Sequence, residues 1–227
     1  MHSFAEDYKE SVAYYEKSWR VMDETLLRLC REHPDHTSAA SVFAKLWIIG
    51  RSYATGIERK IATNGTQGSS MSQLATHFLG YGKELDRLFD ELRTVVEPLT
   101  AAKLRTIVSV HGRLVALLRP ITRRGQSPRS FVSKYMHFHH PAVPIYDSVA
   151  VAALSGVVRW NKELMVFEMP NDADEAYGWY VMRFFQLYQK IESEHLPLTV
   201  KCLDNYLLGL GGSSEQGIQE PTGRDDL

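Results

Sequence analysis

Apolar side chains recur every three or four residues along almost the whole chain, and this spacing constrains the fold more than any other sequence feature. The clearest run of this spacing lies between residues 177 and 191 and places on one face Tyr177, Tyr180, Val181, Phe184, Tyr188 and Ile191. Such spacing puts side chains on one face of an α-helix. Strand character is confined to residues 157–167, where we expect one small β-hairpin. The sequence predicts an all-α, multi-helix globular domain.

Helix breakers and N-cap residues predict the element boundaries. We expect helices at about 4–32, 38–62, 72–92 with an interruption at 80–82, 101–118, 129–139 and 148–154. A further helix carries Tyr177 to Ile191, and Pro197 separates it from a last helix that ends near residue 209. Asp147 or Ser148 would cap the helix that begins at 148. Asp172 and Glu175 have the spacing of a capping box and would open the helix that carries Tyr177. Short loops between helices leave both a helix-hairpin and a helix-bundle architecture open.

The chain has 227 residues, of which 44% are apolar and 23% charged, an ordinary composition for a globular protein. We treat residues 1–210 as one helical domain, with an alternative division into an N-terminal helical part, 1–97, and a basic part, 98–210. Residues 211–227 read as a disordered tail. No apolar run is long enough for a membrane span, and no signal peptide is visible, so we expect a cytoplasmic protein without a membrane partner. Two cysteines exclude a disulfide framework.

Charge is distributed very unevenly along the chain. Between Glu97 and Asp147 there is no acidic residue, although the interval holds eight cations. The formal net charge of -1 therefore hides a basic segment, 98–146, within an acidic remainder. A basic segment can bind the phosphates of DNA or RNA. Alternatively, its cations pair with carboxylates elsewhere in the fold.

Residues 123–128, Arg-Arg-Gly-Gln-Ser-Pro, precede a predicted helix start. Guanidinium groups and backbone N–H groups in such a segment can meet one phosphate. The candidate phosphate-binding residues are Arg123, Arg124, Gly125, Ser127, Arg129, Lys134, His137 and His140. Of the histidines, His137 and His140 share a helix face, but two histidines lack a third ligand, so we expect no metal site and no cofactor.

Residues 120–154 resemble the second half of the motif of helix-hairpin-helix DNA glycosylases. In that family a phosphate-binding hairpin leads through a helix and a proline-rich bend to a catalytic Asp at the next helix start. The bend here is Pro144-Ile145-Tyr146-Asp147, and Gly125 lies 22 residues before Asp147. The resemblance implies DNA as the partner of segment 98–146, with Asp147 as the catalytic carboxylate.

The hairpin departs from the family pattern at two positions. Ser127 stands where the second glycine is expected, and Arg129 stands where bifunctional members carry a nucleophilic Lys. Arginine cannot form a Schiff base, so the resemblance implies a monofunctional enzyme that uses water, or a DNA-binding relative without chemistry.

Asp147 and Glu58 are the candidate catalytic residues. Asp147 would stabilise an oxocarbenium-like sugar, and Glu58, on a polar helix face with Arg51, would transfer a proton. The plainer interpretations are an N-cap for Asp147 and an ion pair for Glu58. For the whole chain, the alternative function is a non-enzymatic interaction module whose basic face binds an acidic protein, which a second copy of the chain could supply. A third interpretation is a small-molecule phosphate or metal hydrolase.

Overall fold

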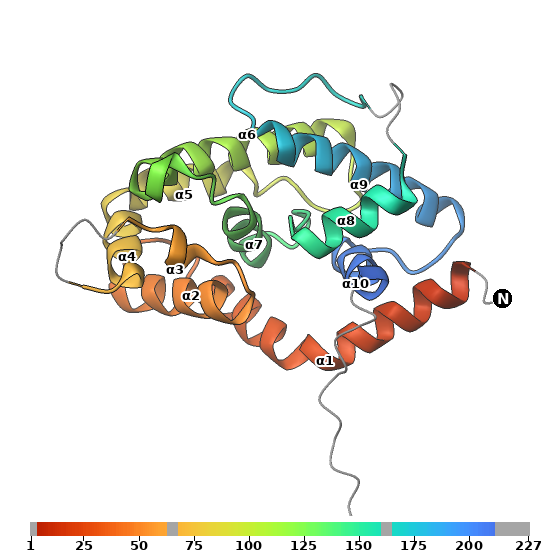
Figure 1. Ribbon diagram of the computed structural model, residues 1–227, viewed down its shortest axis with the longest axis horizontal. Helices are drawn as coiled ribbons and strands as arrows, with labels where there is room; N and C mark the ends of the chain where they lie inside the picture. The colour runs from red at the N-terminus through yellow and green to blue at the C-terminus, as the bar shows by residue number, and fades with distance from the viewer. Residues whose placement is uncertain (1–3, 63–67, 160–164, 212–227) are drawn as a thin grey trace, which may run out of the picture.

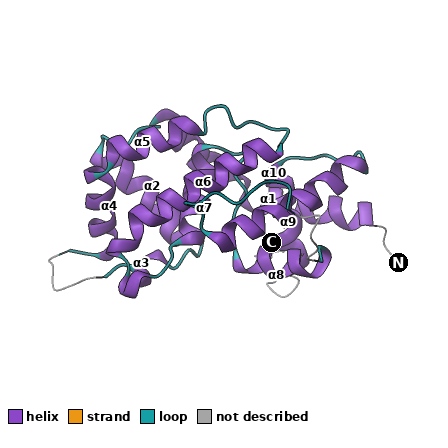
Figure 2. Cartoon of the chain, turned by 90° about the horizontal axis from the view of Figure 1, so that it is seen from above, coloured by secondary structure: helices purple, strands orange, loops and turns teal. Residues whose placement is uncertain are grey.

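The computed structural model describes residues 4–62, 68–159 and 165–211. These residues form ten α-helices and two short 3₁₀ helices and contain no β-strand, which confirms the all-α prediction (Figure 2). The helices are α1 (Phe4–Glu32), α2 (Ala39–Ser52), α3 (Ile57–Lys60), α4 (Ser70–Gly80), α5 (Gly82–Glu91), α6 (Ala101–Leu118), η1 (Arg119–Ile121), η2 (Arg123–Gly125), α7 (Arg129–His139), α8 (Ser148–Val157), α9 (Glu175–Ser193) and α10 (Val200–Gly211).

Helix α7 lies in the middle of the molecule. Figure 1 shows it between α1 and α2 on one side and α5 and α6 on the other. Every residue from Phe131 to Phe138 is buried, including Ser133, Lys134 and His137. A helix buried on all sides needs partners for each of its polar groups. The contacts of α7 therefore position most of the polar chemistry of the protein.

The long helix α1 runs along one edge of the molecule (Figure 1). Its 29 residues span about 43 Å at 1.5 Å per residue. Its first half packs on α10, where Tyr8 meets the Tyr206 ring and donates a hydrogen bond to the Pro197 carbonyl at 2.8 Å. Its last turns contact α2 and α7 through the buried Leu26 and Cys30. Helix α1 thus joins the two ends of the described chain to its centre.

One cluster of buried apolar side chains draws on all ten α-helices. Residues before and after position 97 belong to this same cluster, for example Leu46 of α2 and Met136 of α7. The division of the chain into domains stays a prediction.

Two predicted features fall wholly or partly outside the described residues. The hairpin expected at 157–167 includes residues 160–164, and its described flanks, 157–159 and 165–167, are not strands. The predicted tail begins at 211, which still belongs to α10, and residues 212–227 lie outside the described part.

The N-caps show where local sequence patterns succeed and where they fail. Asp147 caps α8, as predicted, and accepts a hydrogen bond from the Val149 amide. The cap of α9 is Asp174 rather than Asp172. Asp172 instead accepts a hydrogen bond from Ser109 at 2.8 Å, so a contact 63 residues away takes the carboxylate that the capping-box spacing had assigned.

Candidate functional site

The chain between α6 and α7 folds into a hairpin of two 3₁₀ turns, η1 and η2. A single antiparallel bridge between Ile61 and Thr122 holds it beside α3, and the Ala62 amide donates to the Ile121 carbonyl at 2.9 Å. Backbone φ is positive at Arg124 and Gly125, at 54° and 65°. Glycine suits that conformation, whereas arginine enters it only at a cost. The segment predicted to bind phosphate therefore exists as a sharply turned, tethered hairpin.

Five cations belong to α3, to the hairpin or to its first residue. We call them the basic cluster: the exposed Arg59, Arg119, Arg123 and Arg124, and the half-buried Lys60. Arg123 is tied by its Nε atom to the Ile61 carbonyl at 3.1 Å, and Lys60 Nζ donates to the Ser127 carbonyl at 3.1 Å. Burial and the nearby charge of Arg129 lower the pKa of Lys60. Within the described residues, no carboxylate forms an ion pair with any member of the basic cluster.

Two other predicted phosphate ligands attach the hairpin to α9. Arg129 forms an ion pair with Asp174, with Nη2 and Oδ2 3.0 Å apart, and the Ser127 hydroxyl donates to the same carboxylate at 2.9 Å. Asp174 also accepts the Tyr177 amide as the N-cap of α9. Burial raises the pKa of this carboxyl, but the Arg129 guanidinium outweighs it, and the net shift is downward. Arg129 and Ser127 thus have structural partners already.

The remaining predicted phosphate ligands lie apart from the hairpin. His137 is buried and donates from Nδ1 to the Val143 carbonyl at 2.8 Å. Burial lowers its pKa to about 4, so it is neutral near pH 7. His140 follows α7 at its C-terminal end and lies against Phe89. Lys134 is buried and contacts Asp147. The structure brings five of the eight predicted residues together: Arg123, Arg124, Gly125 and Ser127 lie in the hairpin, and Arg129 follows it as the first residue of α7.

Asp147 uses both carboxylate oxygens. Oδ1 accepts the Val149 amide at 2.9 Å, and Oδ2 lies 2.7 Å from Lys134 Nζ. Lys134 also donates to the Tyr53 carbonyl at 2.6 Å. The bend before Asp147 is fastened to the core, since the Pro144 carbonyl accepts from the Tyr177 hydroxyl at 2.8 Å. The carboxylate is thus held rigidly at the helix start where the family resemblance expects it, with an ammonium group against it.

Glu58 lies on α3 and pairs with Arg51, with Oε1 and Nη2 2.9 Å apart. This is the ion pair that the plainer interpretation of the polar helix face describes. No hydrogen bond or ion pair joins Glu58 to Asp147.

The sequence does not single out a set of buried polar side chains that belong to α9 and α10. Tyr180 OH, Asp204 Oδ1 and Asn205 Oδ1 are buried without a hydrogen-bond partner in the described structure. Burial raises the pKa of Asp204, although the charges of Lys201 and Lys134 oppose this. The signal that could have found it is the pair Asp204-Asn205 inside an otherwise apolar helix, α10.

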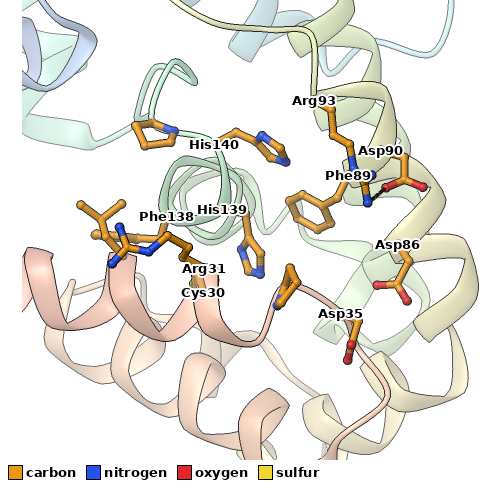
Figure 3. Close-up of a pocket in the computed structure, with 13 residues that line it drawn as sticks. Cys30, Arg31, Asp35, Asp86, Phe89, Asp90, Arg93, Phe138, His139 and His140 are labelled. Carbon is orange, nitrogen blue, oxygen red and sulfur yellow. Dashed lines mark ion pairs between the residues drawn. The ribbon is translucent and has the colours of Figure 1, made fainter.

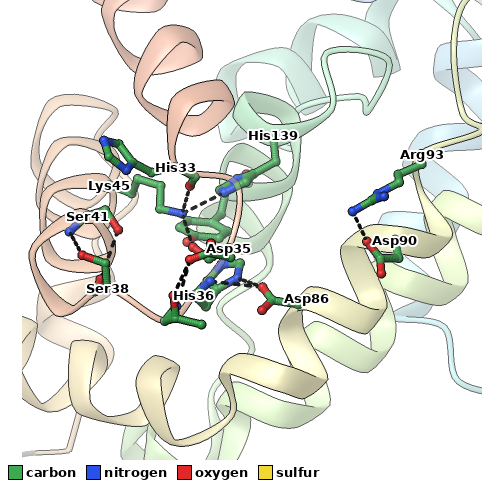
Figure 4. A network of polar contacts seen from close by, with 12 residues as sticks. His33, Asp35, His36, Ser38, Ser41, Lys45, Asp86, Asp90, Arg93 and His139 are labelled. Atoms are coloured by element: carbon green, nitrogen blue, oxygen red, sulfur yellow. Dashed lines mark hydrogen bonds and ion pairs between the residues drawn. The ribbon is translucent and has the colours of Figure 1, made fainter.

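A pocket of about 570 Å³ at the C-terminal end of α7 was also missed. It lies between the end of α1, the helix α5 with the turn that follows, and residues 138–141 (Figure 3). Behind it, Lys45 is fully buried and donates to the carbonyls of His33 and Asp35 and to His139 Nε2 (Figure 4). His139 is not among the residues that the sequence singles out, because its partners Lys45, His36 and Phe89 come from segments about 50 to 100 residues away.

No family model, curated protein or solved structure matches this chain. Within residues 4–62, 68–159 and 165–211, no helix combines the length and apolar character that a membrane crossing requires. The same residues contain no group of three or more His, Cys, Asp and Glu side chains placed to hold a metal ion.

Proposed function

We propose that this protein binds nucleic acid through the basic cluster. The proposal rests on a difference among the cations of segment 98–146: some form ion pairs with carboxylates, and others do not. Three of them have carboxylate partners from other elements: Arg113 with Glu91 and Asp172, Arg129 with Asp174, and Lys134 with Asp147. The arginines of the hairpin do not. Guanidinium groups without a carboxylate partner, on an exposed turn, are suited to phosphate oxygens.

Two exposed aromatic side chains lie on α2, which the Arg51–Glu58 ion pair joins to α3. The Arg51 guanidinium that pairs with Glu58 of α3 also lies over the Trp47 ring, 3.7 Å from its centroid. Phe43, one turn earlier, contacts Trp47 with the ring centroids 5.5 Å apart, and both side chains are more than a third exposed. Exposed aromatic rings next to cations are suited to stacking on unpaired bases. This supports a substrate with distorted or unstacked bases over a regular duplex.

The finer proposal is hydrolysis of an N-glycosidic bond. The bond between the sugar and the base would break, the base would leave with the electron pair and take up a proton, and water would add to the sugar cation. Asp147 would stabilise that cation, in accord with the resemblance of residues 120–154 to the glycosylase motif. Release of free base from a damaged duplex would test this step.

The alternative is a protein-interaction module in which the basic cluster binds an acidic partner. The same guanidinium groups would serve both functions, and both would weaken with salt. A preference for an abasic or distorted duplex over its undamaged twin favours the nucleic-acid proposal.

The test is fluorescence anisotropy with an abasic-analogue duplex and its undamaged twin at ~50 and ~200 mM salt. We expect tighter binding to the analogue. We expect Arg123→Ala/Arg124→Ala to weaken binding by about tenfold or more at the lower salt and to reduce the salt slope by about 2, because two phosphate contacts are lost.

The matched control is Lys17→Ala/Arg20→Ala, which removes two exposed cations from α1 and leaves the hairpin intact. Equal losses in the two double variants would show that only net charge matters. That result, or no binding of either duplex, would contradict the proposal.

A further inference from the structure

The middle of α1 presents an exposed face that carries both apolar and charged side chains. Val21 is 73% exposed, more than any other large apolar side chain of the described residues, and Tyr14, two turns earlier, is 48% exposed. Helices α2, α7 and α10, which α1 contacts most, all lie on one side of it in Figure 1. The other side of α1 is therefore open to a partner.

An open groove follows this exposed face. Its volume is about 540 Å³, and its walls come from α1 itself: Val21, Glu24, Thr25, Leu27, Arg28 and Arg31. The buried side of α1, which includes Leu26 and Cys30, lies away from it, because Val21 and Leu26 are about 140° apart around the helix axis. A groove along one exposed face of a helix is suited to the side chains of another helix.

The charged residues of this face have no partner in the fold. Within the described residues, the side chains of Lys17, Glu24 and Arg28 form no ion pair and no hydrogen bond. All three are exposed. Their charges are therefore available to a partner with the complementary arrangement.

The order of the residues along this face is complementary to itself. Lys17 lies four residues before Val21, and Glu24 lies three residues after it. Tyr14 and Arg28 lie seven residues to either side of Val21. In an antiparallel pair of α1 helices with the two Val21 side chains in contact, each Lys17 lies near Glu24 of the other copy. Each Tyr14 ring then lies near Arg28 of the other copy, where a cation and a ring face attract each other.

We infer that two copies of this chain pair through α1, antiparallel about a two-fold axis at Val21. A parallel pair would set Lys17 against Lys17 and Glu24 against Glu24, and like charges repel. A partner with charges of one sign fits less well than a second copy, because this face carries charges of both signs. A contact between two identical surfaces about a two-fold axis also closes on itself and stops at two chains.

The size of the contact sets its strength. The stretch from Tyr14 to Arg28 is about 21 Å long at 1.5 Å per residue. A single pair of helices of this length forms a small interface, so we expect a dissociation constant of about 10 µM or weaker. Below about 1 µM most chains are then single, so loss of Lys17 does not affect duplex titrations made at such concentrations.

The first test is sedimentation velocity of the full chain between about 1 and about 200 µM. We expect the average mass to rise from that of one chain towards that of two. Val21→Glu should weaken pairing by about tenfold or more, because it places two carboxylates against each other at the axis. Val21 is exposed, so the fold should persist, and circular dichroism checks this.

An exchange of charges tests the register of the pair. Lys17→Glu alone and Glu24→Lys alone should each pair at least about tenfold more weakly than the parent, because like charges then face each other. An equal mixture of the two variants should pair as the parent does, since two carboxylates of one chain meet two ammonium groups of the other. The matched control is Lys9→Glu, which reverses an exposed charge of α1 about 120° around the axis from Val21 and should pair normally.

The inference is overturned if the parent stays a single chain at about 200 µM, if Val21→Glu pairs like the parent, or if the mixed variants fail to pair. It does not rest on nucleic-acid binding by the hairpin. Arg123→Ala/Arg124→Ala should pair like the parent, so failure of this inference and failure of the hairpin proposal are distinguishable.

Discussion

Lys134 and Asp147 form the ion pair that joins the buried centre of α7 to the start of α8. The side chain of Lys134 is 7% exposed and that of Asp147 is 20% exposed. Removing one partner of a pair this buried leaves the other charge uncompensated, which typically costs 3–5 kcal/mol. The pair thus combines a structural role with the position where the glycosylase resemblance expects catalysis.

Asp147→Asn separates these roles. Asn is as good an N-cap as Asp, so α8 should still form, but Lys134 loses its counter-charge. We expect the free energy of unfolding to fall by about 3 kcal/mol. We also expect release of free base from a damaged duplex to disappear, while binding of the duplex remains. Urea unfolding and a base-release assay measure the two effects.

The double variant Lys134→Met/Asp147→Asn serves as the control for stability. It removes both charges, so it should unfold less readily than the sum of the single changes predicts. Unchanged base release in Asp147→Asn would exclude Asp147 from catalysis and leave it as a cap and ion-pair partner.

Asp174 connects three elements, because it caps α9 and holds both Arg129 of α7 and Ser127 of the hairpin. We expect Asp174→Ala to lower the free energy of unfolding by about 2–3 kcal/mol, from a lost N-cap and an unpaired, partly buried Arg129. Asp172→Ala, at a 40% exposed side chain, should cost about 0.5 kcal/mol. Chemical denaturation of both variants measures the difference, and equal losses would contradict the structural assignment.

Element by element, most helices were predictable, but their surroundings were not. The helix predicted at 38–62 is wrong in its length, because residues 53–56 are not helical and separate α2 from α3. Residues 129–139 were predicted as a helix and form α7. Their burial on every side could not be inferred, because Ser133, Lys134 and His137 look like a polar face when the helix is considered alone. Their partners, such as Tyr53, lie up to 81 residues away and are brought close only by the fold. The pocket could not be predicted for the same reason, because its polar groups come from α1, α2, α5 and α7.

At the scale of the whole molecule, buried histidines dominate the expected response to acid. Burial lowers the pKa of His36, His111 and His137 to about 4, and that of His139 also falls. The unfolded chain takes up these protons near pH 6.5, so it binds more protons than the folded chain between about pH 6.5 and 4. Stability therefore falls as pH decreases through this window, by about 1.4 kcal/mol per pH unit for each histidine.

We expect the protein to unfold by about pH 5, before most carboxylates are protonated. Glu97 and Asp204, whose pKa values are raised by burial, oppose this trend because the folded chain takes up their protons first. Circular dichroism across the pH range measures the transition. His137→Asn should make the pH dependence shallower, because one buried neutral histidine is removed. A transition confined to the region below pH 4 would contradict the assignment of neutral buried histidines.

The uneven distribution of charge along the chain predicts only part of the molecular surface. The acid-free segment does contain exposed hairpin arginines, but Arg113, Arg129 and Lys134 are neutralised by carboxylates outside it. Tertiary contacts decide which cations remain without a carboxylate partner. Counting charges along the sequence cannot identify them.

The packing of α1 on α10 has a consequence for the order in which the protein can be built. Helix α1 is translated long before α10, yet it buries Tyr8 against Tyr206 of that helix. At 5–20 residues per second, α10 follows the end of α1 by roughly 10–40 s. During translation the apolar stripe of the N-terminal half of α1 therefore stays without its final partner until α10 has been made.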